Sequence, residues 1–314
     1  MKSVVFLSVL VAVFHTAFSQ TEKGCPDAEE ITPCTCFYDG LTHLRCERLS
    51  DAEPLRTVFK NSQRFRYNEV YIEYSTLQYL PSDMFKNVQV EALYLKNTTL
   101  TQLFDESPEH VEDLVKLYLE NSRVLRGIIW KILEPLKNLR ILNIYYNSIK
   151  TLGSEFSQYA SKNLEQLTLY GTETRTLKPG VFADFPKLDK VDIQNSKISA
   201  LTRDIFPTPW NGHFLYLSGN ELTEIPKNLF SQMPNLQSLS LGQNQLSVLP
   251  QDAFDGNFGG IRYLVLDDNP LKCDCLMKWV IVYKPPDVRG KCEKPKDKNG
   301  RKLKDLEPED FHCQ

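Results

Sequence analysis

Histidine is scarce in this sequence: five occur among 314 residues, and no two lie close together along the chain. Three motifs that carry common chemistry are also absent: the HExxH zinc signature, the GxSxG nucleophile turn and a glycine-rich phosphate-binding loop. Each of these chemistries needs particular side chains at a fixed spacing. The sequence therefore predicts no catalytic residues, no metal site and no cofactor, and we expect a protein without enzymatic activity.

Long apolar runs are lacking too, with the exception of Val4 to Phe18 near the start. Lys2 precedes this run and the small residues Ala17 and Ser19 end it, which is typical of a secretory signal peptide over residues 1–19. An uncleaved membrane anchor is the alternative, but the run has about 15 residues and a spanning helix needs roughly 20. We expect a secreted, extracellular protein that does not insert into a membrane.

An excess of positive charge is absent. The 37 basic residues fall to 36 when Lys2 is removed with the signal peptide, against 40 acidic residues. This balance favours neither nucleic acid nor an acidic membrane surface as a partner. The lysine-rich stretch 291–304 has the composition of a heparin patch, but its interleaved acidic residues, Glu293 and Asp297 among them, favour an ordinary solvated surface.

No cysteine occurs between Cys46 and Cys273, so the eight cysteines form two groups of four, one near each end. In an exported chain this distribution favours two disulfides in each group over zinc binding. The residues alone allow three pairings within each group. We expect a cysteine-rich cap at each end, over residues 20–66 and 272–314.

The region between the caps, residues 67–271, repeats one apolar pattern nine times. It is clearest at Leu236, Leu239, Leu241, Asn244 and Leu246, which read LxxLxLxxNxL. This pattern resembles the leucine-rich repeat, which implies an α/β solenoid: a horseshoe with a concave parallel β-sheet and disulfide-stapled caps. The ninth positions of the nine copies are Ser75, Thr98, Ser122, Asn147, Thr172, Ser196, Asn220, Asn244 and Asn269.

Alternation within each predicted strand separates an inward from an outward face. One inward row is Val70, Leu93, Leu117, Leu142, Leu167, Val191, Leu215, Leu239 and Leu264, and a second lies two residues further on. Because five ninth positions carry a short hydroxyl in place of asparagine, we expect the first six repeats to be less regular than the last three. Arg126, Gly127 and Ile128 replace the usual residues of repeat three and predict a local irregularity.

The outward positions are rich in tyrosine. Such a row favours recognition of a protein partner, since tyrosine is common in binding hot spots. The alternative explanation needs no ligand: tyrosine suits strands and stacks with its neighbours across them. A glycan is a further possible ligand, and self-association is left open. The candidate partner-binding residues are Tyr71, Tyr94, Lys96, Tyr118, Glu120, Tyr145, Tyr146, Tyr170, Phe214, Tyr216 and Tyr263. Asn97, in Asn97-Thr98-Thr99, is the candidate glycosylation site.

The caps carry a more specific resemblance. The spacing C-x8-CxC-x9-C from Cys25 and the motif NPLxCDCxxxW from Asn269 are similar to the flanks of extracellular leucine-rich-repeat proteins. That resemblance implies the pairs Cys25–Cys36, Cys34–Cys46, Cys273–Cys292 and Cys275–Cys313. Within this group the chain looks most like arthropod proteins resembling the non-catalytic subunit of oplophorus-luciferin 2-monooxygenase. The implied function is a secreted, non-catalytic protein-binding scaffold, and the narrower resemblance implies a subunit of an extracellular enzyme. A matrix protein or an innate pattern-recognition protein is the alternative.

Overall fold

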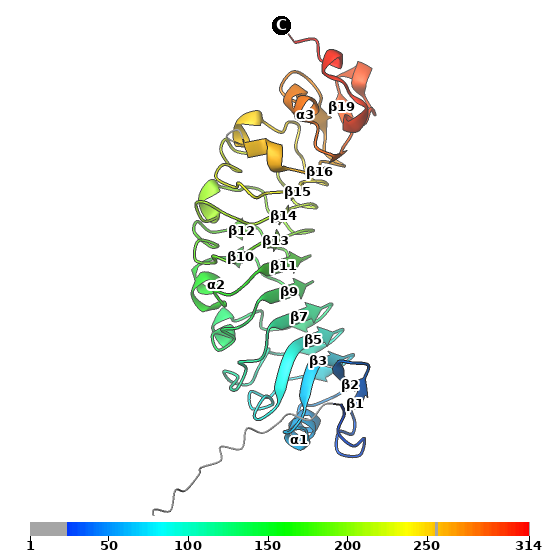
Figure 1. Ribbon diagram of the computed structural model, residues 1–314, viewed down its shortest axis with the longest axis vertical. Helices are drawn as coiled ribbons and strands as arrows, with labels where there is room; N and C mark the ends of the chain where they lie inside the picture. The colour runs from blue at the N-terminus through cyan, green and yellow to red at the C-terminus, as the bar shows by residue number, and fades with distance from the viewer. Residues whose placement is uncertain (1–23, 255–256, 314) are drawn as a thin grey trace, which may run out of the picture.

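The computed structural model describes residues 24–254 and 257–313. The predicted signal peptide, residues 1–19, lies outside the described residues. Figure 1 shows a curved solenoid in which successive turns of the chain stack on one another, with the long ladder of strands along the concave side and helical turns along the other. The predicted horseshoe with a concave, almost entirely parallel sheet is confirmed.

One twelve-stranded sheet runs the length of the molecule, in the order β1-β2-β3-β5-β7-β9-β11-β13-β14-β15-β16-β18. Neighbouring strands are parallel except β1 and β2, which form an antiparallel hairpin. The strands span Thr35–Tyr38 (β1), Thr42–Glu47 (β2), Arg66–Glu73 (β3), Gln89–Lys96 (β5), Lys116–Glu120 (β7), Ile141–Tyr145 (β9), Gln166–Tyr170 (β11), Lys190–Asp192 (β13), Phe214–Tyr216 (β14), Ser238–Ser240 (β15), Tyr263–Val265 (β16) and Asp287–Arg289 (β18). Both caps therefore contribute strands to the repeat sheet.

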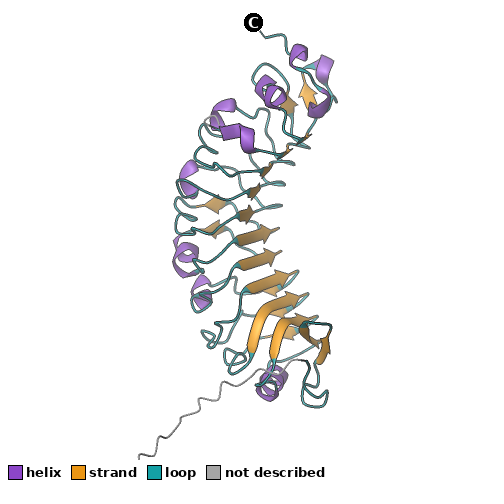
Figure 2. Cartoon of the chain, viewed as in Figure 1, coloured by secondary structure: helices purple, strands orange, loops and turns teal. Residues whose placement is uncertain are grey.

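The remaining elements are short. Three α-helices occur among the described residues: Glu53–Asn61 (α1), Ser154–Tyr159 (α2) and Lys278–Tyr283 (α3). Two-residue strands form small ladders away from the main sheet: Thr76–Leu77 (β4), Thr99–Leu100 (β6), Arg123–Val124 (β8), Thr151–Leu152 (β10), Thr176–Leu177 (β12) and Leu271–Lys272 (β17), the last paired with Cys292–Lys294 (β19). 3-10 turns occupy Trp130–Leu133, Arg203–Ile205, Gln251–Ala253, Asn257–Gly260, Lys296–Lys298, Leu303–Asp305 and Pro308–Asp310. Figure 2 shows how few helices the fold contains.

The core lies between the sheet and the convex side. The predicted inward row from Val70 to Leu264 is buried throughout, and so is the second row two residues further on, because a single repeat cannot cover its own apolar face. Phenylalanines fill the convex side. They pack ring against ring, as in the pairs Phe182–Phe206 at 5.6 Å and Phe230–Phe254 at 4.8 Å between centroids.

The ninth position of each repeat satisfies buried backbone groups. The Asn244 side chain accepts a hydrogen bond from the Leu222 N–H at 3.0 Å and donates to three carbonyl oxygens. A hydroxyl keeps part of this network: Ser122 Oγ accepts from the Thr98 N–H at 3.1 Å. Strand length varies over the first six repeats, from eight residues in β3 and β5 to three in β13, whereas each of the last three repeats has a strand of three residues. This agrees with the expectation that the first six repeats are less regular.

Repeat three does carry the predicted irregularity. The ladder β4-β6-β8, which follows the ninth position in the first three repeats, stops at β8. Gly127 has φ +76° in the turn that follows, and Leu125 and Ile129 are exposed on either side of it. The next ladder, β10-β12, forms at a later point of its repeats.

Disulfides hold both caps. The structure pairs Cys25 with Cys36, Cys34 with Cys46, Cys273 with Cys292 and Cys275 with Cys313, the same four pairs that the cap motifs imply. The Trp279 indole of α3 packs beneath the last repeat, where its Nε1 donates to the Leu249 carbonyl oxygen at 2.9 Å. Each cap covers the apolar core that a terminal repeat would otherwise expose.

Candidate binding face

The first part of the concave face is a column of three stacked tyrosines. Parallel register sets Tyr71, Tyr94 and Tyr118 side by side on β3, β5 and β7. The ring centroids are 4.7 Å apart for Tyr71–Tyr94 and 4.4 Å for Tyr94–Tyr118, with interplanar angles of 14° and 7°. All three rings are half-buried. Stacking across strands stabilises a sheet by itself, so this column has a structural explanation that needs no ligand.

Charged groups surround the column and pair with one another. Glu69 accepts hydrogen bonds from the hydroxyl groups of Tyr71 and Tyr94 and lies 2.9 Å from His43 Nδ1. Lys96 Nζ lies 5.0 Å from the Tyr71 ring centroid and 3.4 Å from a Glu120 carboxylate oxygen. Burial, reinforced by the nearby Glu69 carboxylate, raises the pKa of Tyr71 and of Tyr94. Both phenols therefore stay neutral and keep donating.

The column ends at the fourth repeat. In the row that continues the column, Asn143 pairs with Tyr118, Thr168 with Asn143, and Asp192 with Thr168. Asn143 Oδ1 is buried and, in the part of the chain that the structure describes, has no hydrogen-bond partner. The predicted tyrosine row is thus two groups, because the next tyrosines lie on a neighbouring row of the sheet.

The second group consists of Tyr145, Tyr146 and Tyr170, which we term the central tyrosine cluster. Tyr145 and Tyr170 face each other on β9 and β11, with ring centroids 5.8 Å apart. The Tyr146 ring meets Tyr170 edge to face at 5.6 Å. Tyr146 lies one residue beyond β9, so it borders the sheet at the end of the strand, and its side chain is 58% exposed.

The backbone at Tyr146 is left-handed, with φ +58°. All nine repeats share this conformation at the eighth position, which is occupied by Tyr74, Asn97, Asn121, Tyr146, Gly171, Asn195, Gly219, Gln243 and Asp268. Glycine and asparagine tolerate it readily, whereas a bulky side chain is strained there. The sequence carries a signal for this left-handed conformation, since glycine or asparagine recurs one place before the ninth position.

Gly171 makes room for the Tyr146 ring. A Cβ at Gly171 would lie 2.7 Å from Tyr146 Cδ1, closer than side-chain atoms approach one another. The glycine has φ +63°, so it also accommodates the left-handed turn. The ring of one repeat therefore rests on the backbone of the next.

The remaining predicted residues are dispersed toward the C-terminal repeats. Phe214 and Tyr216 lie on β14, and Lys190 Nζ is 5.3 Å from the Tyr216 ring centroid. Tyr263 lies on β16 and is exposed, with no ring neighbour among the described residues. These residues do not join the central tyrosine cluster. Sequence reasoning missed His43 and Arg45, which the cap strand β2 adds to the same concave face.

Asn97 is exposed at the margin of the face, directly after β5. Its Oδ1 accepts a hydrogen bond from Asn121 Nδ2 at 2.6 Å. Thr98 is buried, and its hydroxyl group donates to the backbone. Glycosylation at Asn97 stays a prediction.

Within residues 24–254 and 257–313, no group of three histidine, cysteine, aspartate or glutamate side chains gathers in a way that suits a metal ion. Within the same ranges, no helix combines the length and the apolar character needed to cross a bilayer.

Comparison with known proteins agrees with this geometry. The family model described as "Leucine rich repeat" matches residues 213–271. The fold is a leucine-rich-repeat solenoid. A leucine-rich-repeat protein of Leptospira interrogans is 25% identical, with a TM-score of 0.61 over 77% of this chain and 57% of that one.

Two more distant structures share the fold. A chain in a complex of Latrophilin 3, Unc5D and FLRT2, in which FLRT2 supplies the leucine-rich repeats, is 21% identical, with a TM-score of 0.58 over 82% of this chain and 85% of that one. A chain of a TLR13–ssRNA13 complex is 18% identical, with a TM-score of 0.57 over 78% of this chain. This chain covers 42% of that TLR13-complex chain and, as noted, 57% of the Leptospira protein.

Proposed function

We propose that this chain is a secreted, non-catalytic scaffold that binds a protein partner on its concave face, with the central tyrosine cluster as the main contact. Export is supported by the four disulfides, because such bonds form and persist in oxidising compartments. A binding role is supported by the repeat fold, which presents one long concave sheet as a surface.

The observation that carries the proposal is Tyr146. Strand preference and cross-strand stacking account for Tyr94, which is half-buried between two rings. They do not account for an exposed tyrosine in a left-handed conformation that asparagine or glycine occupies in most other repeats. Strained residues persist mainly where function retains them. An exposed ring beside two others offers a large apolar area with hydroxyl groups, which suits a protein hot spot.

A protein is favoured over the other ligands. The charges of the face have both signs, as with Lys96 and Glu120, which suits a partner of mixed charge. FLRT2 occurs in a complex with other proteins, and this supports the same mode here. TLR13 occurs with single-stranded RNA, but the acidic balance of the present chain disfavours that ligand. A role as the non-catalytic subunit of an extracellular enzyme is a finer proposal, and it rests on the resemblance of the cap motifs alone.

The test is affinity capture from the extracellular fluid of the source animal, followed by mass spectrometry and titration of the captured protein. The triple variant Tyr145→Ala, Tyr146→Ala and Tyr170→Ala should lose the partner, with affinity reduced at least a hundredfold, since hot-spot side chains contribute about 2 kcal/mol or more each. The control is Tyr38→Ala, which removes an exposed tyrosine from the N-terminal cap. Equal capture by the triple variant and the control would rule out the central tyrosine cluster.

A further inference from the structure

The C-terminal cap contains a cavity of about 260 Å³ that lies outside the central tyrosine cluster. Strand β18, the last strand of the main sheet, forms one wall, and the 3-10 turn Leu303–Asp305 contributes to the other. The lining residues are Asp267, Asp287, Val288, Arg289, Gly290, Lys291, Lys302 and Lys304. Four cations against two carboxylates give the lining an excess of two positive charges.

Backbone pairing brings two of these lysines face to face. Lys291 and Lys302 form an antiparallel bridge, and the Leu303 N–H donates to the Gly290 carbonyl oxygen at 3.0 Å. Like charges directly opposite each other destabilise a strand pair. An anion close to both side chains would offset this repulsion.

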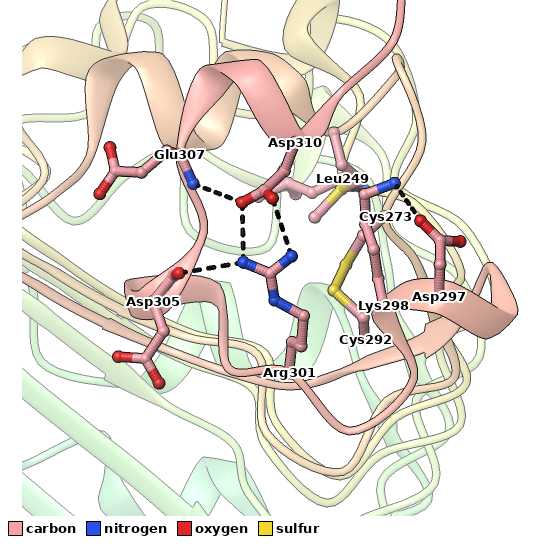
Figure 3. The surroundings of a disulfide bond; sticks show 10 residues. Leu249, Cys273, Cys292, Asp297, Lys298, Arg301, Asp305, Glu307 and Asp310 are labelled. Carbon is pink, nitrogen blue, oxygen red and sulfur yellow. Dashed lines mark hydrogen bonds and ion pairs between the residues drawn. A yellow bond between two sulfur atoms is a disulfide. The ribbon is translucent and has the colours of Figure 1, made fainter.

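Other cations of the same stretch serve the cap itself, as Figure 3 shows. Arg301 donates to both carboxylate oxygens of Asp310 at 2.8 Å. Lys298 is buried, and its Nζ lies 5.5 Å from the centroid of the Phe311 ring. The stretch 291–304 is therefore divided between cations that hold the cap together and cations that face a cavity, and it is not the uniform solvated surface that the sequence favoured.

The lysines that line the cavity make no such close pairs, although Lys304 is near enough to Asp287 to help lower the pKa of that carboxyl group. Arg289 is engaged, since its guanidinium lies 2.9 Å from an Asp287 carboxylate oxygen. Among the described residues, no ion pair within 4.0 Å involves Lys291, Lys302 or Lys304, and all three are exposed. Three ammonium groups at one cavity, with two of them on bridged residues, form an anion-binding arrangement.

We propose that this cavity binds a sulfated polysaccharide of the extracellular matrix. Lysine recognises a sulfate group as a compact point charge, and a linear chain can present sulfates at intervals that several lysines reach together. The cavity is slightly smaller than the roughly 300–1,000 Å³ of pockets for drug-sized ligands, so it accepts one sulfated sugar unit while the chain continues across the surface. Disulfide-bonded caps place the protein outside the cell, where such polymers are abundant.

The experiment measures binding of the intact disulfide-bonded chain to immobilised heparin by surface plasmon resonance. The variant Lys291→Gln, Lys302→Gln and Lys304→Gln removes the three lysine ammonium groups of the lining. The control, Lys227→Gln, Lys294→Gln and Lys296→Gln, removes three exposed lysines outside the lining and changes the net charge equally. The cavity variant should bind at least tenfold more weakly, and the control should stay within twofold of the wild type.

Three further binding measurements test the role of charge at the cavity. Replacing the three cavity lysines by arginine should keep binding, and desulfated heparin should bind weakly to every variant. Raising the salt from 0.05 to 0.2 M should weaken wild-type binding about tenfold or more, as expected when about three charges contact a polyanion. The proposal is overturned if the cavity variant and the control lose affinity equally, if the wild type ignores heparin at 0.15 M salt, or if anionic phospholipid vesicles bind more tightly than heparin does.

Discussion

Replacing Tyr146 by glycine should separate folding from binding. The left-handed backbone at this position costs a bulky residue about 1–2 kcal/mol, which glycine would recover. Two losses oppose this gain in stability. The edge-to-face contact with Tyr170 is removed, at about 0.5–1.5 kcal/mol, and glycine has more conformational freedom in the unfolded chain, at about 0.5–1 kcal/mol. These contributions nearly cancel, so the free energy of unfolding should stay within about 1 kcal/mol of the wild type.

Tyr94→Ala is the matched comparison. Its ring stacks on Tyr71 and on Tyr118, so alanine removes two contacts at about 0.5–1.5 kcal/mol each together with half-buried apolar surface. Urea unfolding should show a loss of about 1–3 kcal/mol for Tyr94→Ala and almost none for Tyr146→Gly. Titration of the captured partner should show the larger loss of affinity for Tyr146→Gly. The reasoning is refuted if Tyr146→Gly unfolds more than about 2 kcal/mol more easily, because Tyr146 would then be a structural residue.

Two further predictions concern the scaffold. Asn244→Ala should lower the free energy of unfolding in urea by about 1–3 kcal/mol, because the buried Leu222 N–H loses its acceptor. Asn244→Ser should lower it less, because a hydroxyl group can still accept this hydrogen bond. Equal losses for the two variants would contradict this role of the ninth position. The hydrogen bonds from Arg301 lower the pKa of Asp310 to about 2, so this pair stabilises the cap above the ordinary aspartate pKa of 3.8 and ceases to do so as pH falls through about 2. The unfolding temperature, measured between pH 5 and pH 2, should change less with pH for Asp310→Asn than for the wild type. Identical pH profiles of the two proteins would exclude a contribution of this pair to the stability of the cap.

The repeat pattern predicted the buried rows because inward and outward residues alternate strictly along each strand, and each strand repeats its neighbour. Val70 and Leu264 could be placed in one row although nearly 200 positions separate them. The aromatic residues of the convex side were harder to place. Trp130 and Phe156 pack together at 5.0 Å, yet the motif around them departs from the common spacing, so no pattern marked them.

The outward face was harder to predict, because contacts with side chains on other strands decide how its residues are arranged. Tyr118 lies four residues before the ninth position of its repeat and Tyr145 lies two residues before its own, so the two rings belong to different rows of the sheet. The sequence carried this offset, but the ring contacts that divide the tyrosines into two groups came from the structure. The division of the lysine-rich stretch depends in the same way on the bridge between Lys291 and Lys302, which no local pattern records. Composition predicted the kinds of residue at these surfaces, and three-dimensional pairing decided which of them act together.

The two ends of the long sheet bear on how molecules of this protein can assemble. An uncovered parallel edge would accept a strand from another copy and allow growth into a fibre. At one end, the edge strand β1 runs antiparallel to the rest of the sheet. A strand from another copy that runs in the direction of the main sheet therefore cannot continue its parallel hydrogen-bond pattern there. At the other end β18 has only three residues, two of them charged and paired with each other. In the described part of the chain, neither end of the sheet therefore presents a long parallel edge, which disfavours end-to-end polymerisation.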